Sequence, residues 1–98
     1  MKKVISSPSA PKAVGPYSQA IEANGTLYIS GQLPINPATG SMPSTIEEQT
    51  AQSLKNIEAI LHEAGYTFDN VVKTTVLLDN IGDFAAMNGV YADTFTKD

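Results

Sequence analysis

The dipeptide Asn24-Gly25 constrains the fold of this chain most tightly, because it joins two strand-like segments through a link of only two residues. Two-residue hairpins favour the type I′ turn, which needs positive φ at both central positions, and Asn-Gly meets that need best. We therefore predict that residues 18–23 and 26–31 form an antiparallel hairpin.

This turn also sets which residues face each other across the hairpin. Successive side chains of a strand alternate between the two faces of a sheet. With Asn24-Gly25 as the turn, Tyr17 is opposite Gln32 and Gln19 is opposite Ser30. All four share one face, where a small polar ligand could be held.

The best-marked helix of the chain follows a turn-rich loop at 33–43 that contains three prolines. Thr45 and Glu48 have the spacing of a capping box, and apolar residues then recur along one stripe until Gly65. The spacing predicts a helix that begins after Thr45 and ends before Gly65.

Three further elements are expected outside the hairpin and this helix. Residues 3–5 suit a short edge strand, and 71–78 are dense in β-branched residues and suit a strand. Residues 81–95 suit a second helix, whose inward stripe would be Phe84, Met87, Tyr91 and Phe95, with Asn88 along the same face.

This order of elements indicates a single α+β domain over residues 1–98. Two helices need a broad sheet to cover their apolar stripes, whereas only three convincing strands are visible. We therefore expect that further strands or another chain complete the sheet. The hairpin carries apolar residues on both faces, which favours a sheet covered by helices on one face and by another subunit on the other.

The residue types that are absent exclude several kinds of chemistry. The 98 residues contain no Cys and no Arg, and His62 is the single His. The absence of Cys excludes a thiolate nucleophile, and one His without Cys cannot form a typical zinc site. A net charge of −4 argues against general affinity for nucleic acid. No long apolar run or secretory signal is visible, so we expect no membrane association and a cytoplasmic location.

Three short motifs, in order, carry a resemblance to a known family. They are Gly15-Pro16-Tyr17-Ser18-Gln19-Ala20, Ile29-Ser30-Gly31-Gln32 and Met87-Asn88-Gly89-Val90-Tyr91. Together they resemble the reactive intermediate deaminase family (RidA, or YjgF), and the similarity runs from about Val4 to the last residue. Some relatives carry the labels endoribonuclease L-PSP or translation initiation inhibitor.

The resemblance implies a chorismate-mutase-like α+β fold, with a mixed sheet and two helices on one face, in homotrimers with a pocket at each subunit boundary. It implies hydrolysis of 2-imino or 2-enamino acids, of the 2-iminobutanoate and 2-iminopropanoate type, to 2-keto acids and ammonia, without a cofactor or metal. The catalytic residues that it assigns in this chain are Tyr17, Ser30 and Asn88. Gly31 and Gln32 are the substrate-binding candidates.

The chain departs from the family pattern in its carboxylate-binding group. Family members carry a Pro-Ala-Arg stretch and a later Glu, and the Arg binds both oxygens of the substrate carboxylate through its planar donors. This sequence has no Arg. We therefore expect a C-terminally incomplete domain with impaired activity.

Each candidate also has a purely structural interpretation. Tyr17 would serve as an amphipathic interface residue, Ser30 as a strand-end serine, and Gln19 and Gln32 as supports of the ladder. Asn88-Gly89 lowers helix propensity by about 1 to 1.5 kcal/mol, for which a kink or close packing is an alternative reason. At the level of function, the alternatives are a non-catalytic ligand sensor or regulatory protein and, less favoured by the acidic charge, a ribonuclease or translation inhibitor.

Overall fold

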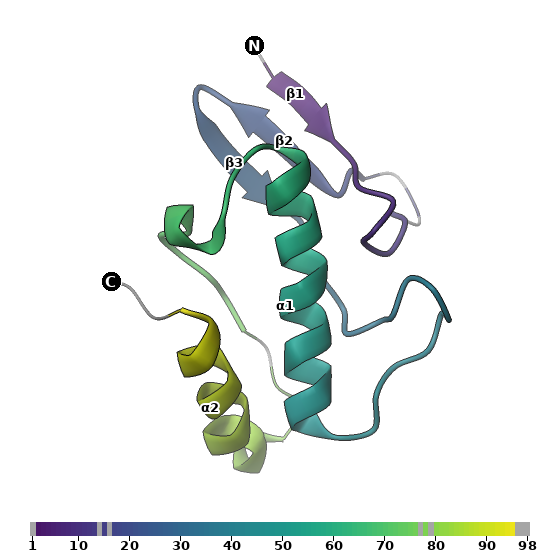
Figure 1. Ribbon diagram of the computed structural model, residues 1–98, viewed down its shortest axis with the longest axis vertical. Coiled ribbons are helices and arrows are strands. Elements are labelled where there is room, and N and C mark those ends of the chain that lie inside the picture. Colours follow the sequence, from purple (N-terminus) through teal and green to yellow (C-terminus); the bar gives the residue numbers. More distant parts are fainter. Residues whose placement is uncertain (1, 14, 16, 77, 79, 96–98) are drawn as a thin grey trace.

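The computed structural model describes residues 2–13, 15, 17–76, 78 and 80–95, which fold into a small sheet and two helices. The strands are β1 (Lys2–Ile5), β2 (Ala20–Ala23) and β3 (Thr26–Ile29); the helices are α1 (Ile46–Glu63) and α2 (Phe84–Thr94); and the 3₁₀ turns are η1 (Phe68–Asn70) and η2 (Ile81–Asp83). The sheet lies behind the C-terminal half of α1, and α2 lies beside its N-terminal half (Figure 1). The α+β class is confirmed.

The predicted hairpin is present with the predicted register. Asn24 and Gly25 have φ values of 52° and 78°, as a type I′ turn requires, and Ala23 pairs with Thr26. Each strand is four residues long, shorter than predicted. One further backbone hydrogen bond extends the ladder beyond the strands: the Ser30 amide donates to the Gln19 carbonyl at 3.0 Å.

The edge strand expected at residues 3–5 is also present, as β1. It pairs antiparallel with β2, so the described sheet has the order β1-β2-β3 and is antiparallel throughout. One face packs on α1 and forms a core of Ile5, Ala10, Ala20 and Ile60, flanked by Leu27, Ile29, Ala59 and Ala64.

The opposite face of the sheet is open in the single chain. Val4 and Tyr28 on this face are 59% and 64% exposed. A covering subunit was expected there, and the described residues of one chain supply no such cover.

Helix α1 begins and ends as the sequence predicts. The Thr45 side chain accepts a hydrogen bond from the Glu48 amide at 3.2 Å, which caps the first turn. Gly65 has a φ of +86°, a value that glycine adopts without strain, and the helix ends just before it. Leu54, Ile60 and Leu61 are buried on its inner face.

The strand expected at residues 71–78 is not observed. Residues 71–76 and 78 have no regular secondary structure, and Val72 is 97% exposed; positions 77 and 79 lie outside the described residues. High β-propensity makes a strand only when a neighbouring strand supplies hydrogen bonds. The described strands β1 to β3 pair with one another and not with this segment.

The second helix differs from the prediction at its start and on its inward face. It opens with the 3₁₀ turn η2, where the Asn80 side chain accepts from the Gly82 amide at 2.8 Å. Met87 is buried, but Phe84 is 53% exposed and Asn88 is exposed, so neither lies on the buried stripe as expected. Helix α2 packs against α1, and of its described residues only Met87 is buried.

The other end of α2 is held by aromatic contacts. The Phe95 ring lies 4.9 Å from the Tyr91 ring and 5.3 Å from the Phe68 ring, the latter edge-to-face. Neither described helix is long and apolar enough to cross a membrane.

Candidate functional site

Ser30 lies directly after β3, where the hairpin ladder ends. Its hydroxyl donates to the Ser18 carbonyl at 2.6 Å, and its amide donates to the Gln19 carbonyl. The hydroxyl hydrogen is therefore used within the chain, and the oxygen keeps lone pairs that can accept a hydrogen bond.

Gly31 presents open backbone next to Ser30. It is exposed, and a Cβ placed on it would meet no atom within 4 Å. Within the described part of the chain, its amide has no hydrogen-bond partner. A ligand could approach this amide closely, and a carboxylate oxygen is a suitable acceptor for it.

Gln32 connects this backbone to α1. Its side-chain amide donates to the Ser30 carbonyl at 3.2 Å, and its own carbonyl accepts from the Ser53 hydroxyl at 3.2 Å. The half-buried side chain thus supports the Ser30 backbone, which is the structural role considered for it.

Tyr17 belongs to the segment that leads into β2, three residues before that strand begins. Its side chain is 53% exposed, and it immediately precedes Ser18, whose carbonyl binds Ser30. The end of the hairpin thus carries Ser30 and Gly31, and Tyr17 is the residue before the Ser18 carbonyl that binds Ser30; we call this region the candidate edge.

Asn88 is not brought to that edge by any contact in the described part of the chain. Asn88 is exposed on α2, which lies beside the N-terminal half of α1, whereas the sheet lies behind the C-terminal half (Figure 1). The backbone that follows the hairpin runs back toward the first half of α1, where Ser53 donates to the Gln32 carbonyl. No hydrogen bond in the described part of the chain links Asn88 with Ser30, Gly31 or Gln32.

Gln19 has a structural role, as its interpretation as a support of the ladder proposed, but its side chain bonds the N-terminal loop instead. It is only 4% exposed; its carboxamide oxygen accepts from the Ser7 amide at 2.6 Å, and its nitrogen donates to the carbonyls of Ser7 and Pro11. It therefore holds the N-terminal loop against the hairpin and is not available to a ligand.

Asn56 is a second buried amide that sequence reasoning missed. It is 1% exposed and donates to the carbonyls of Leu33 and Ile35 at 3.1 and 3.0 Å, while its oxygen accepts from Gln52. The available signal was a polar residue inside the apolar stripe of an amphipathic helix.

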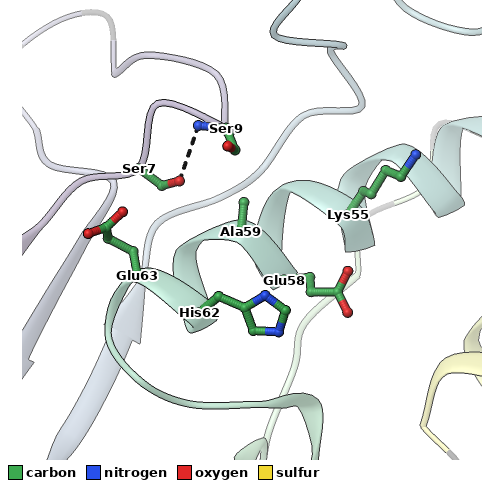
Figure 2. A pocket seen from close by; sticks show the side chains of 7 residues that line it. All are labelled: Ser7, Ser9, Lys55, Glu58, Ala59, His62 and Glu63. Carbon is green, nitrogen blue, oxygen red and sulfur yellow. Dashed lines mark hydrogen bonds between the residues drawn. The ribbon is translucent and has the colours of Figure 1, made fainter.

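Two hollows in the described part of the chain are lined by residues other than the candidates. The first, of about 530 Å³, is lined by Ser7, Ser9, Lys55, Glu58, Ala59, His62 and Glu63 (Figure 2). The second, of about 370 Å³, lies between α1 and α2. The first mixes acidic and basic side chains, and no cluster of three or more metal-binding side chains occurs among the described residues.

A titratable pair joins the hairpin to the end of α1. The Tyr66 hydroxyl donates a hydrogen bond to the Glu22 carboxylate. That bond, together with partial desolvation and the negative charge of Glu22, raises the pKa of Tyr66 above its ordinary value of 10.0. The pair ties β2 to the segment that follows the helix.

Comparison with solved structures identifies the fold. The YjgF gene product of Escherichia coli superimposes with a TM-score of 0.93 at 41% identity, over 96% of this chain and 74% of that one. A Rid family protein of Yersinia pestis, YyfA, superimposes with a TM-score of 0.94 at 54% identity, over 97% and 76%. The YjgF-type fold is confirmed.

Sequence comparison gives the same relationship. The chain is 53% identical to a RutC family protein of Pyrococcus horikoshii over 96 residues, which are 97% of this chain and 76% of that protein. It is 48% identical to the 2-iminobutanoate/2-iminopropanoate deaminase of Mus musculus, over 97% of this chain and 71% of that protein. The family model described as endoribonuclease L-PSP matches residues 7–98. The chain therefore belongs to the endoribonuclease L-PSP family, the RidA/YjgF family that its motifs resemble.

Proposed function

We propose that this chain is an imine/enamine deaminase that hydrolyses small 2-imino or 2-enamino acids to 2-keto acids and ammonia. Relatives from mouse, goat and cattle that are 48 to 50% identical over 96 residues are named 2-iminobutanoate/2-iminopropanoate deaminases. The observation that carries the proposal is the edge formed by Tyr17, Ser30 and Gly31. It combines an exposed phenol, a hydroxyl oxygen and an open backbone amide.

The chemistry needs no covalent nucleophile. Protonation of the imine nitrogen makes its carbon electrophilic; water adds there, and the C–N bond then breaks to release ammonia and leave the ketone. The protein has to bind the carboxylate, orient the water and move protons.

Each candidate has a role that follows from its geometry. The Gly31 amide would donate to the substrate carboxylate, with Gln32 holding the backbone behind it. The Ser30 oxygen would accept from the attacking water, and Tyr17 would hydrogen-bond water or substrate. Asn88 would complete the site from a neighbouring subunit of a homotrimer. In this proposal the enzyme acts on small molecules in the cytoplasm, without a cofactor or metal.

The carboxylate interaction is the weak part of this site. With no Arg in the 98 residues, a neutral amide replaces the two parallel charge-assisted bonds of a guanidinium. We therefore expect weak substrate binding and slow turnover.

The proposal is tested with 2-iminobutanoate released in situ by a pyridoxal-phosphate-dependent dehydratase in the presence of semicarbazide. The protein should suppress semicarbazone formation, and Tyr17→Phe and Ser30→Ala should each lower the rate by about tenfold to a hundredfold. Tyr28→Phe is the matched control, because Tyr28 is exposed on the hairpin but lies outside the candidate edge. Wild-type rates in both site variants would contradict the assignment of Tyr17 and Ser30 to the active site.

A non-catalytic sensor of 2-keto acids is the second candidate, and the absence of Arg is the observation that favours it. It predicts binding of 2-ketobutyrate without acceleration of imine hydrolysis. Ribonuclease activity, which the family description names, is disfavoured by the net charge of −4.

A further inference from the structure

A chain of hydrogen bonds runs from α1 into the candidate edge. The Ser53 hydroxyl donates to the Gln32 carbonyl, the Gln32 side chain donates to the Ser30 carbonyl, and the Ser30 hydroxyl donates to the Ser18 carbonyl. Tyr17 immediately precedes Ser18. One helical side chain is thus linked in three steps to both strands of the candidate edge.

The edge needs such an anchor because it lies beyond the regular ladder. Strand β3 ends at Ile29, and among the described residues one backbone bond, from the Ser30 amide to the Gln19 carbonyl, continues the ladder, with the Ser30 hydroxyl bond to the Ser18 carbonyl beside it. Helix α1 has 18 residues and a capped start, and its inner face is packed on the sheet. It is the longest described element, and its hydrogen-bonded backbone can fix the backbone of residues 30–32.

Ser53 belongs to a row of polar side chains along this helix. Gln49, Ser53 and Asn56 follow at spacings of four and three residues, which places them on one face. All three donate to carbonyls of the loop 32–43: Ser53 to Gln32, Asn56 to Leu33 and Ile35, and Gln49 to Pro43. Ser53 binds nearest the candidate edge and Gln49 farthest from it.

We infer that Ser53 is a positioning residue for the substrate carboxylate, acting through Gln32 to hold the Gly31 amide in its binding orientation. The inference rests on the ligand-binding part of the proposed function. It assigns Ser53 no contact with the substrate.

The test compares Ser53→Ala with Gln49→Ala. Each variant removes one donor to the same loop, but only Ser53 lies on the path to Gly31. Affinity for 2-ketobutyrate is measured by NMR titration of the Gly31 amide, and urea unfolding is measured for every variant. Ser53→Ala should weaken affinity by about threefold to tenfold, the effect of one lost hydrogen bond, whereas Gln49→Ala should leave it unchanged.

Two further readouts separate positioning from general stability. Ser53→Thr keeps the hydroxyl and should restore wild-type affinity. Hydrogen exchange of the Ser30 amide should be faster in Ser53→Ala than in Gln49→Ala at matched global stability. Equal affinities in the two alanine variants would overturn the inference while leaving the proposed function intact. Failure of the wild-type chain to bind 2-ketobutyrate would instead overturn the proposed site, and the inference with it.

Discussion

At the scale of single residues, two buried side-chain amides stabilise loops of this chain. Asn56 and Gln19 are 1% and 4% exposed, and each bonds backbone carbonyls of a loop that lacks regular structure. A carbonyl buried without a donor is costly, so these amides stabilise the loops as strand neighbours stabilise a ladder.

Replacing Asn56 by alanine should lower the free energy of unfolding substantially. The change leaves the Leu33 and Ile35 carbonyls and the Gln52 amide without their partner. We expect a loss of about 1 to 3 kcal/mol in urea unfolding. Gln52→Ala is the matched control, since it removes only the bond to the Asn56 oxygen and should cost less. Equal losses in the two variants would contradict a special role for the bonds to the loop.

Ionisation of Tyr66 should make stability depend on pH in the alkaline range. Its folded pKa is raised, chiefly by the hydrogen bond to Glu22, so its contribution is complete below pH 10 and declines as the pH rises through the folded pKa. Wild-type stability should therefore fall more steeply above pH 10 than that of Tyr66→Phe. Tyrosinate absorbance should show Tyr66 ionising at lower pH in Glu22→Gln; an unchanged titration would show that Glu22 does not raise the pKa of Tyr66.

At the scale of elements, the hairpin and α1 were predictable because their signals lie within a few residues. The strand expected at 71–78 was not, because it depended on a distant partner. Asn24-Gly25 set the hairpin register, and the cap at Thr45 with the stop at Gly65 set α1, because these signals act within a few residues. The strand expected at 71–78 depended on a pairing partner, which composition does not reveal.

The candidate site divides in the same way. The hairpin register predicted that Tyr17, Gln19, Ser30 and Gln32 share one face, but it did not predict the partners of the Gln19 side chain. In fact Gln19 bonds a loop that precedes it by about ten residues. A polar residue inside an apolar stripe marks Asn56 as unusual, but neither its periodicity nor that of Gln19 identifies the loop carbonyls that the two side chains bind.

Residues 72–76 should exchange their amide hydrogens quickly in the isolated chain. Within the described structure their backbone donors have no hydrogen-bond partners, whereas the amides inside α1 are bonded along the helix. Exchange measured by NMR should approach the rate of an unstructured peptide at Thr74 and remain slow at Leu54. Protection at Thr74 close to that at Leu54 would contradict this expectation and indicate that the segment pairs with another strand.

At the scale of the whole molecule, one side of the sheet is open and the candidate residues are divided. Val4 and Tyr28 are more than half exposed on the uncovered face, an arrangement expected of an interface between copies. Asn88 on α2 has no hydrogen bond to Ser30 or Gly31 within the described part of the chain, and Figure 1 shows α2 and the sheet beside different halves of α1. A homotrimer with sites at its boundaries would account for both features.

Mixing two defective variants tests this arrangement directly. If each site takes Tyr17 from one subunit and Asn88 from the next, Tyr17→Phe and Asn88→Ala each damage every site of a pure trimer. Equal amounts of both variants are unfolded and refolded together so that trimers assemble at random. A boundary is intact when one subunit supplies Tyr17 and the next supplies Asn88, which occurs at about one boundary in four. Imine hydrolysis, or 2-ketobutyrate binding where turnover is slow, should then exceed the mean of the two variants alone. A mixture that only matches that mean would show that both residues of a site come from the same chain, or that the two do not share a site.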